Sequence, residues 1–127
     1  MTTEFQDRQN RTIAFDVDDD SVEAFYQGAR IGQFTLRIEQ HEPPIGQLVH
    51  ADVIDLEEKF RGAGIGKEMV RRAFEHHGEK IIPPATYYAE KEQRNSMTQE
   101  GMALMRSCQR EGWVAEFPDN EKPDGDE

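Results

Sequence analysis

A glycine-rich turn between a predicted strand and a predicted helix constrains the fold of this chain more than any other feature. Residues 61–67 read RGAGIGK; they follow the run Gln47–Leu56, which is apolar on both faces, and open an amphipathic segment over 64–77. Three glycines at alternate positions let the backbone turn tightly and approach a ligand closely. The N–H groups and the positive dipole end of the following helix would point at that ligand. The sequence therefore predicts a strand–turn–helix unit that binds an anion such as a phosphate.

The turn matches neither of the common nucleotide-binding motifs. A Walker A sequence needs glycine where Arg61 stands and Ser or Thr where Glu68 stands. The dinucleotide motif G-x-G-x-x-G needs glycine at Arg61 or Ala63, or at Met69. Both nucleotide-binding classes are therefore excluded by spacing.

Hydrophobic periodicity predicts the elements around this unit. Alternation of apolar and polar residues indicates strands over 12–17 and 33–39, and a shorter run over 22–26 leads to a turn. Gly78 stands where a left-handed cap would end the first helix. The remaining predicted elements are an edge strand over 80–88 interrupted at Pro83–Pro84, a helix from Ser96 to about Glu111, and a strand over 113–117. This order predicts one α/β domain over 12–117, with a mixed, mostly antiparallel sheet of about six strands and two main helices.

The charge of the chain is distributed unevenly. The formal net charge of the 127 residues is −11, with six acids and two bases in residues 1–20 and five acids and one base in residues 118–127. We expect a flexible segment over 1–11 and a disordered acidic tail over 118–127, because the tail has nothing apolar beyond proline to bury. Residues 59–72, between these acidic ends, contain only one acid but five bases: Lys59, Arg61, Lys67, Arg71 and Arg72. This local excess of positive charge favours an anionic ligand.

Composition excludes several classes of protein. No stretch reaches the roughly 18 consecutive apolar residues of a membrane span, and so acidic a chain is a poor general binder of phosphate backbones. We therefore expect neither a membrane nor a nucleic-acid partner. A single cysteine, Cys108, excludes an internal disulfide framework, and the start of the chain lacks the pattern of a secretory signal, so we expect a cytoplasmic location. No group of residues has the spacing of a metal site, and no metal is expected.

The turn and its surroundings resemble the GNAT superfamily of N-acetyltransferases. Residues 60–66 (FRGAGIG) match its Arg-x-x-Gly-x-Gly motif, and the strand end Ile54–Leu56 is similar to the segment that precedes that motif. Residues 108–113 (CQREGW) resemble the Tyr-x-x-x-Gly-Phe ending of its last helix. The resemblance covers roughly residues 22 to 117, and the segment 80–83 is particularly similar to minimal members that lack the first helices.

The resemblance implies the GNAT fold and acetyl-CoA as cofactor. In this superfamily the strand end binds the pantetheine arm of acetyl-CoA, and the N–H groups of the turn bind its pyrophosphate. The cofactor-binding residues implied here are Ile54, Asp55, Leu56, Arg61, Gly62, Ala63, Gly64, Ile65, Gly66 and Lys67.

The candidate catalytic residues depart from the superfamily pattern. Many members use a carboxylate on the central strand as base and a tyrosine on the last helix as acid, since an ammonium is not a nucleophile and a thiolate benefits from a proton. Cys108 stands at the tyrosine position, where the alternative is a small core residue. Alternation along the strand predicts that His50 and Asp52 share a face with Ile54 and together form the base. The alternative is that this pair ties the strand to a loop.

Ala85 stands where minimal members carry a cysteine, which excludes a covalent cysteine mechanism at that position. Tyr87 and Tyr88 are candidates for lining the substrate end or donating a proton, but the favoured alternative is that they belong to the core. The sequence thus predicts an acetyl-CoA-dependent N-acetyltransferase whose acceptor, a small molecule or a peptide or lysine side chain, attacks the thioester directly through a primary amine. The alternative is a GNAT-like acyl-CoA-binding or regulatory module without turnover, and a third possibility is a protein-interaction domain. Monomer and homodimer both stay open.

Overall fold

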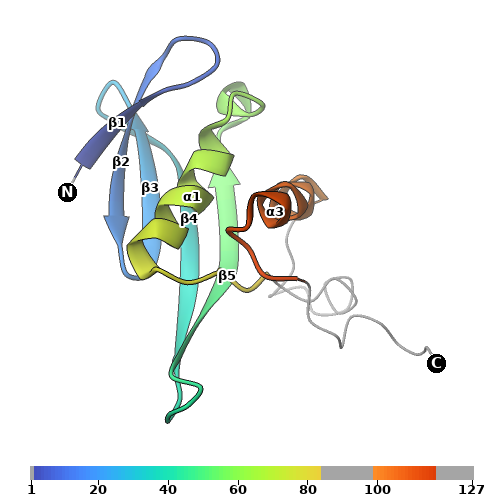
Figure 1. Ribbon diagram of the computed structural model, residues 1–127. Helices are drawn as coiled ribbons and strands as arrows, with labels where there is room; N and C mark the ends of the chain where they lie inside the picture. Colours follow the sequence, from blue (N-terminus) through green and yellow to red (C-terminus); the bar gives the residue numbers. More distant parts are fainter. Residues whose placement is uncertain (1, 84–98, 117–127) are drawn as a thin grey trace.

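A five-stranded antiparallel sheet with helices packed against it forms the part of the chain, residues 2–83 and 99–116, that the computed structural model describes (Figure 1). The strands lie in chain order: β1 Thr2–Gln6, β2 Thr12–Asp18, β3 Ser21–Tyr26, β4 Ala29–Gln40 and β5 Gln47–Leu56. A 3-10 helix, Glu58–Phe60, precedes α1, Ile65–His77, and the last helix is α3, Gln99–Glu111. The predicted class, a mixed and mostly antiparallel sheet with two main helices, is confirmed.

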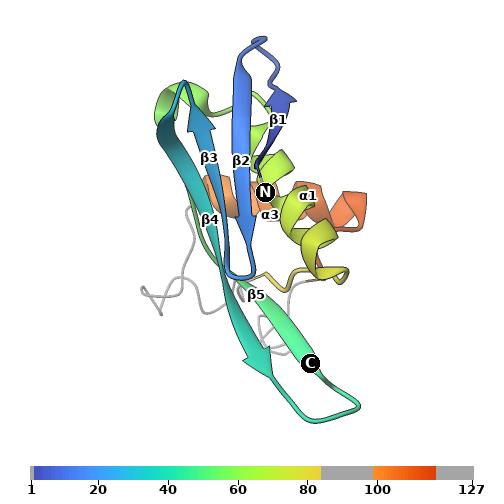
Figure 2. The same cartoon turned by 90° about the vertical axis from the view of Figure 1, so that its left-hand side faces the viewer.

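The core lies between the sheet and α1, on the side of the sheet where Figure 2 shows this helix. Ile13, Phe15 and Phe34 are fully buried because alternate side chains of a strand point to one face. The predicted amphipathic helix meets them with the buried side chains of Ile65, Met69 and Ala73. Gly78 ends α1 in the left-handed conformation, as expected. Within the described residues, no helix is both long and apolar enough to cross a membrane.

Two parallel bridges extend the sheet past β5. They join Ile82 to His50 and Ile81 to Val114. Ala51 donates its N–H to the carbonyl oxygen of Ile82 at 2.7 Å, which fixes the first bridge. In their described parts, the segments predicted as strands over 80–88 and 113–117 form only these bridges, so the sheet has five strands rather than about six. Outside the described residues lie Ala85, Tyr87, Tyr88, Ser96 and the tail 118–127.

The prediction of a flexible segment over 1–11 is wrong for the described part of that segment. β1 pairs with β2 in antiparallel register, with Phe5 opposite Ile13. The ring of Phe5 packs against that of Phe15, with centroids 6.0 Å apart. A single aromatic residue in a polar stretch gives no periodic signal, so the strand depends on a partner that lies farther along the chain.

A bulge in β5 changes which of its side chains face α1. Leu36 pairs with Ala51 and the neighbouring Thr35 pairs with Val53, so Asp52 is an extra residue without an opposite partner. Residues 49, 51, 54 and 56 pair with residues 38, 36, 34 and 32 of β4, which are all on one face. His50 pairs with Arg37 and therefore points to the opposite face. The predicted common face of His50, Asp52, Ile54 and Leu56 is wrong, because simple alternation ignores the bulge.

Candidate functional site

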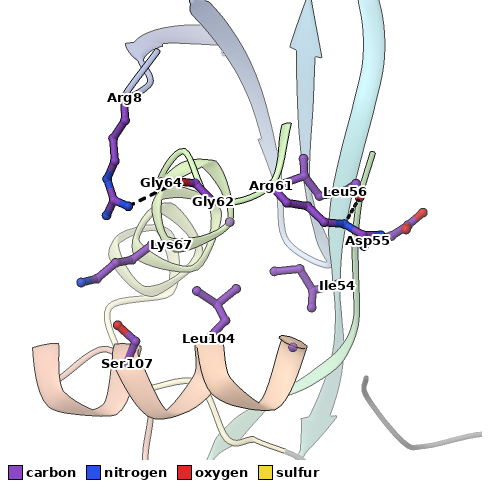
Figure 3. Close-up of a pocket in the computed structure, with 12 residues that line it drawn as sticks. Arg8, Ile54, Asp55, Leu56, Arg61, Gly62, Gly64, Lys67, Leu104 and Ser107 are labelled. Atoms are coloured by element: carbon purple, nitrogen blue, oxygen red, sulfur yellow. Dashed lines mark hydrogen bonds between the residues drawn. The ribbon is translucent and has the colours of Figure 1, made fainter. Parts of the chain in front are cut away.

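A cavity of about 410 Å³ lies between the second half of β5, the glycine turn and α3 (Figure 3). It is lined from β5 and the turn by Ile54, Asp55, Leu56, Arg61, Gly62, Gly64, Gly66 and Lys67. From elsewhere in the chain it is lined by Arg8, Gly101, Leu104 and Ser107. Eight of the ten residues expected to hold a cofactor thus surround one space, and the other two, Ala63 and Ile65, are fully buried beneath it.

The edge of β5 supplies main-chain groups to this cavity. Up to Ala51 the strand has β4 on one side and Ile82 on the other, to which it is joined by hydrogen bonds of 2.7 and 2.8 Å. From Asp52 to Leu56 it pairs only with β4 among the described residues, and Ile54–Leu56 line the cavity. An unpaired strand edge of this kind can hydrogen-bond an extended ligand. Figure 3 shows the carboxylate of Asp55 pointing away from the cavity, so this residue contributes its backbone.

The glycine turn presents the N-terminal end of α1 to the same cavity. Gly62 has φ +75° and Gly64, the N-cap residue, has φ +92°, a region that other residues rarely adopt. No side chain caps the helix, and Glu68 donates its N–H to the carbonyl oxygen of Gly64 at 3.1 Å. The N–H groups before Glu68 precede the first helical hydrogen bond, and free N–H groups at a helix N-terminus are suited to bind an anion.

The basic residues near the turn divide into two groups. Arg61 donates from Nε to the carbonyl oxygen of Leu56 at 2.8 Å, which joins the turn to the strand end, and Lys67 forms an ion pair with Glu111 at 2.9 Å. Both residues line the cavity. Arg71 and Arg72 instead bind the buried carboxylate of Glu68, the latter at 2.8 Å, and do not line it. Two of the five bases noted in the sequence therefore form ion pairs within α1 itself.

α3 closes the cavity with Leu104 and Ser107, neither of which the sequence singled out. A Cβ added to Gly66 would lie 3.1 Å from Cδ2 of Leu104, so the two helices approach closely where the turn needs glycine. Cys108 is fully buried and does not line the cavity. Burial raises the pKa of its thiol to about 12. The alternative assignment, a small core residue, fits this placement.

The two residues predicted to act as base lie apart from the cavity lining, and they do not form a pair. His50 Nε2 lies 2.9 Å from Oε1 of Glu39 on β4, and its side chain is 21% exposed. The hydrogen bond with His50 lowers the pKa of the Glu39 carboxyl below its usual value, which favours an ionised carboxylate beside the imidazole ring. Asp52 occupies the bulge, between the half of β5 that pairs with Ile82 and the half that lines the cavity.

Comparison with known proteins identifies the fold. No protein-family model and no curated protein sequence matches the chain. An acetyltransferase from Trypanosoma brucei matches with a TM-score of 0.54 and 17% identity, over 78% of this chain and 64% of that one. A ribosomal-protein-alanine N-acetyltransferase from Brucella melitensis biovar Abortus 2308 matches with a TM-score of 0.52 and 18% identity, over 78% of this chain and 62% of that one. A glucosamine-6-phosphate N-acetyltransferase from Arabidopsis thaliana matches with a TM-score of 0.51 and 19% identity, over 80% of this chain and 65% of that one.

These matches concern the fold of the chain. At 17 to 19% identity, the likeness shows that the chain shares the fold of these three enzymes, which is the fold that the sequence resemblance implied. The chain spans less than two thirds of the length of each of the three solved structures.

Proposed function

We propose that this chain binds acetyl-CoA in the cavity beside β5 and transfers the acetyl group to a primary amine. The observation that carries the proposal is the meeting of two donor sets at one cavity: the edge of β5 over Ile54–Leu56 and the uncapped N-terminus of α1. The proposal is also supported by the fold that the chain shares with one acetyltransferase and two N-acetyltransferases.

The residues present fit such a cofactor. Acetyl-CoA combines an anionic diphosphate with an extended amide-containing arm and supplies a thioester that is reactive toward amines. The N–H groups of the glycine turn, with Arg61 and Lys67 nearby, would hold the diphosphate. The main-chain groups of Ile54–Leu56 would hold the arm by strand-like hydrogen bonds. Gly62 and Gly64 keep side chains out of the space that the phosphates would fill.

His50 is proposed as the proton acceptor for the amine. An ammonium must lose a proton before it can attack a thioester, and an imidazole beside a carboxylate is suited to take it. Glu39 orients the ring through the 2.9 Å contact. Asp52 follows in the bulge and is proposed to help position the acceptor amine at the same place on the strand. Cys108, buried and with a raised thiol pKa, is not assigned a proton-transfer step.

Thermal unfolding with and without acetyl-CoA tests the cofactor proposal. Ligand at about one hundred times its Kd adds about 2.7 kcal/mol to the free energy of unfolding. We expect this stabilisation in the wild type and its loss in Gly62→Glu, which places a carboxylate at the anion site. Gly28→Glu is the matched control, because both glycines have positive φ and neither has any atom within 4 Å of an added Cβ. A wild type that is not stabilised at saturating ligand overturns the proposal.

Release of CoA thiol across a panel of amines then tests transfer. The panel includes a polyamine, an amino sugar, a peptide with an α-amino terminus and a lysine peptide. Thiol release that depends on one of these amines is the expected result. Stabilisation by acetyl-CoA with no amine-dependent thiol release overturns the transferase proposal and identifies an acyl-CoA-binding module instead.

A further inference from the structure

The turn between β1 and β2 lies against the glycine turn, although more than fifty residues separate them in the chain. The N–H of Arg8 donates to the carbonyl oxygen of Ala63 at 3.0 Å. Nη1 of Arg11 donates to the carbonyl oxygen of Lys59 at 3.1 Å, and the Arg11 guanidinium lies 4.4 Å from the centroid of the Phe60 ring. These contacts fix the N-terminal turn on the loop that leads into α1.

The buried carboxylate of Asp7 holds this turn in one conformation. Its Oδ1 accepts the N–H groups of Gln9 at 2.9 Å and Arg11 at 2.8 Å, and its Oδ2 accepts Nε of Arg11 at 2.7 Å. The Asp7 side chain has no exposed surface. Asp7 forms its ion pair with Arg11 rather than with the neighbouring Arg8, whose side chain lies at the cavity instead.

Arg8 brings an uncompensated positive charge to the cavity. Its guanidinium lines the cavity, and Nη1 donates to the carbonyl oxygen of Gly62 at 3.5 Å, on the same side as Lys67 (Figure 3). Within residues 2–83 and 99–116, Arg8 has no carboxylate partner, whereas Lys67 pairs with Glu111 and Arg11 pairs with Asp7. An arginine fork with unused donors beside an uncapped helix N-terminus is suited to bidentate recognition of a phosphate.

We propose that Arg8 binds the diphosphate of the acyl-CoA ligand, so that the β1–β2 turn forms a third wall of the cofactor site. The inference rests on the proposed function and adds a residue that lies outside the region of GNAT resemblance, which begins near residue 22. The diphosphate is the phosphate group concerned, because the Arg8 side chain contacts the glycine turn itself at Gly62.

Calorimetric titration of Arg8→Gln with CoA and with dephospho-CoA, which lacks the 3′-phosphate, tests the assignment. We expect Kd to rise about 10-fold to 100-fold for both ligands, as for a lost hydrogen bond to a charged group. Arg8→Lys should recover part of the affinity, because lysine keeps the charge and loses the fork. Arg30→Gln is the matched control, since Arg30 is an exposed arginine paired with Glu23 and does not line the cavity.

The possible outcomes separate this inference from the proposed function. A wild type that binds neither ligand overturns the proposed function. A wild type that binds both, with Arg8→Gln binding them equally well, overturns the role of Arg8 alone. If Arg8→Gln weakens the binding of CoA but not the binding of dephospho-CoA, Arg8 lies at the 3′-phosphate, and the diphosphate assignment is overturned. The melting temperature of ligand-free Arg8→Gln should match the wild type, because the substitution keeps the N–H bond to Ala63.

Discussion

The two halves of β5 have the same kind of sequence but different environments. In the first half, residues 47–51, the strand pairs with β4 and, over 49–51, also with Ile82 on its other side, and Val49 is fully buried. In the second half, residues 52–56, only β4 pairs with the strand among the described residues, and the other edge faces the cavity. Ile54 is half-buried there and Val53 is 43% exposed.

The difference shows how one strand contributes both to the core and to the lining of the candidate site. Among the described residues, pairing on the other side of β5 stops at Ile82, and the main-chain groups beyond that point face the cavity. The bulge at Asp52 keeps apolar side chains on the α1 side in both halves, although the count of residues shifts by one. Substitutions in the first half should therefore act on stability, and those in the second half on ligand binding.

The largest effect is expected from Ile54→Glu in the second half. A carboxylate in the cavity would repel an anionic ligand in a partly desolvated space, so the affinity for acetyl-CoA should fall by about 100-fold or more. Calorimetric titration measures the change. Val53→Glu is the control on the opposite face of the same half, and it should bind acetyl-CoA as the wild type does. Equal losses in both variants would contradict the face assignment.

The next largest effect concerns the catalytic rate at the boundary between the halves. His50→Gln should lower kcat by about 100-fold, the scale of general base catalysis, and leave the Kd for acetyl-CoA unchanged. Steady-state kinetics with the best amine of the panel measures it. Glu39→Gln should cause a smaller loss, because it only removes the group that orients the ring. An unchanged kcat in His50→Gln would show that another residue, such as Asp52, accepts the proton.

A moderate effect on stability is expected from Val49→Ala in the first half. Loss of two buried methyl groups and the remaining cavity should cost about 2 kcal/mol, or roughly 5 to 10 °C in melting temperature. Thermal and urea unfolding measure the loss. The Kd for acetyl-CoA at low temperature should stay within about twofold of the wild type by the additivity of distant sites. A large loss of affinity would mean that the two halves are coupled.

The smallest effect on function is expected at Cys108. Cys108→Ala should keep kcat within about twofold, because a buried group that does not contact the cavity takes no part in catalysis. The native thiol should resist alkylation at pH 8, since its pKa is raised from 9.0 to about 12. The raised pKa favours folding below pH 9, and this contribution is lost as the pH rises toward 12. Rapid labelling of the folded protein would contradict the buried placement.

Much of the lining of the candidate site could be predicted from the sequence, because its parts are local. Glycine conformations, the strand before them and the helix after them depend on neighbouring residues, and β5 has the bounds expected, Gln47–Leu56. The surroundings of His50, the proposed proton acceptor, could not be predicted in the same way. A bulge at Asp52 is set by the register with β4, and the carboxylate beside His50 comes from Glu39 on that strand rather than from its own.

The sequence by itself determined a glycine turn between a strand and an amphipathic helix, since periodicity and glycine spacing are properties of short segments. Only the tertiary structure decided which side chains reach that turn. Arg8 and Ser107 arrive from distant parts of the chain, and the buried core removes Cys108 from the cavity. Contacts between distant residues depend on strand register and helix packing, which no local pattern encodes.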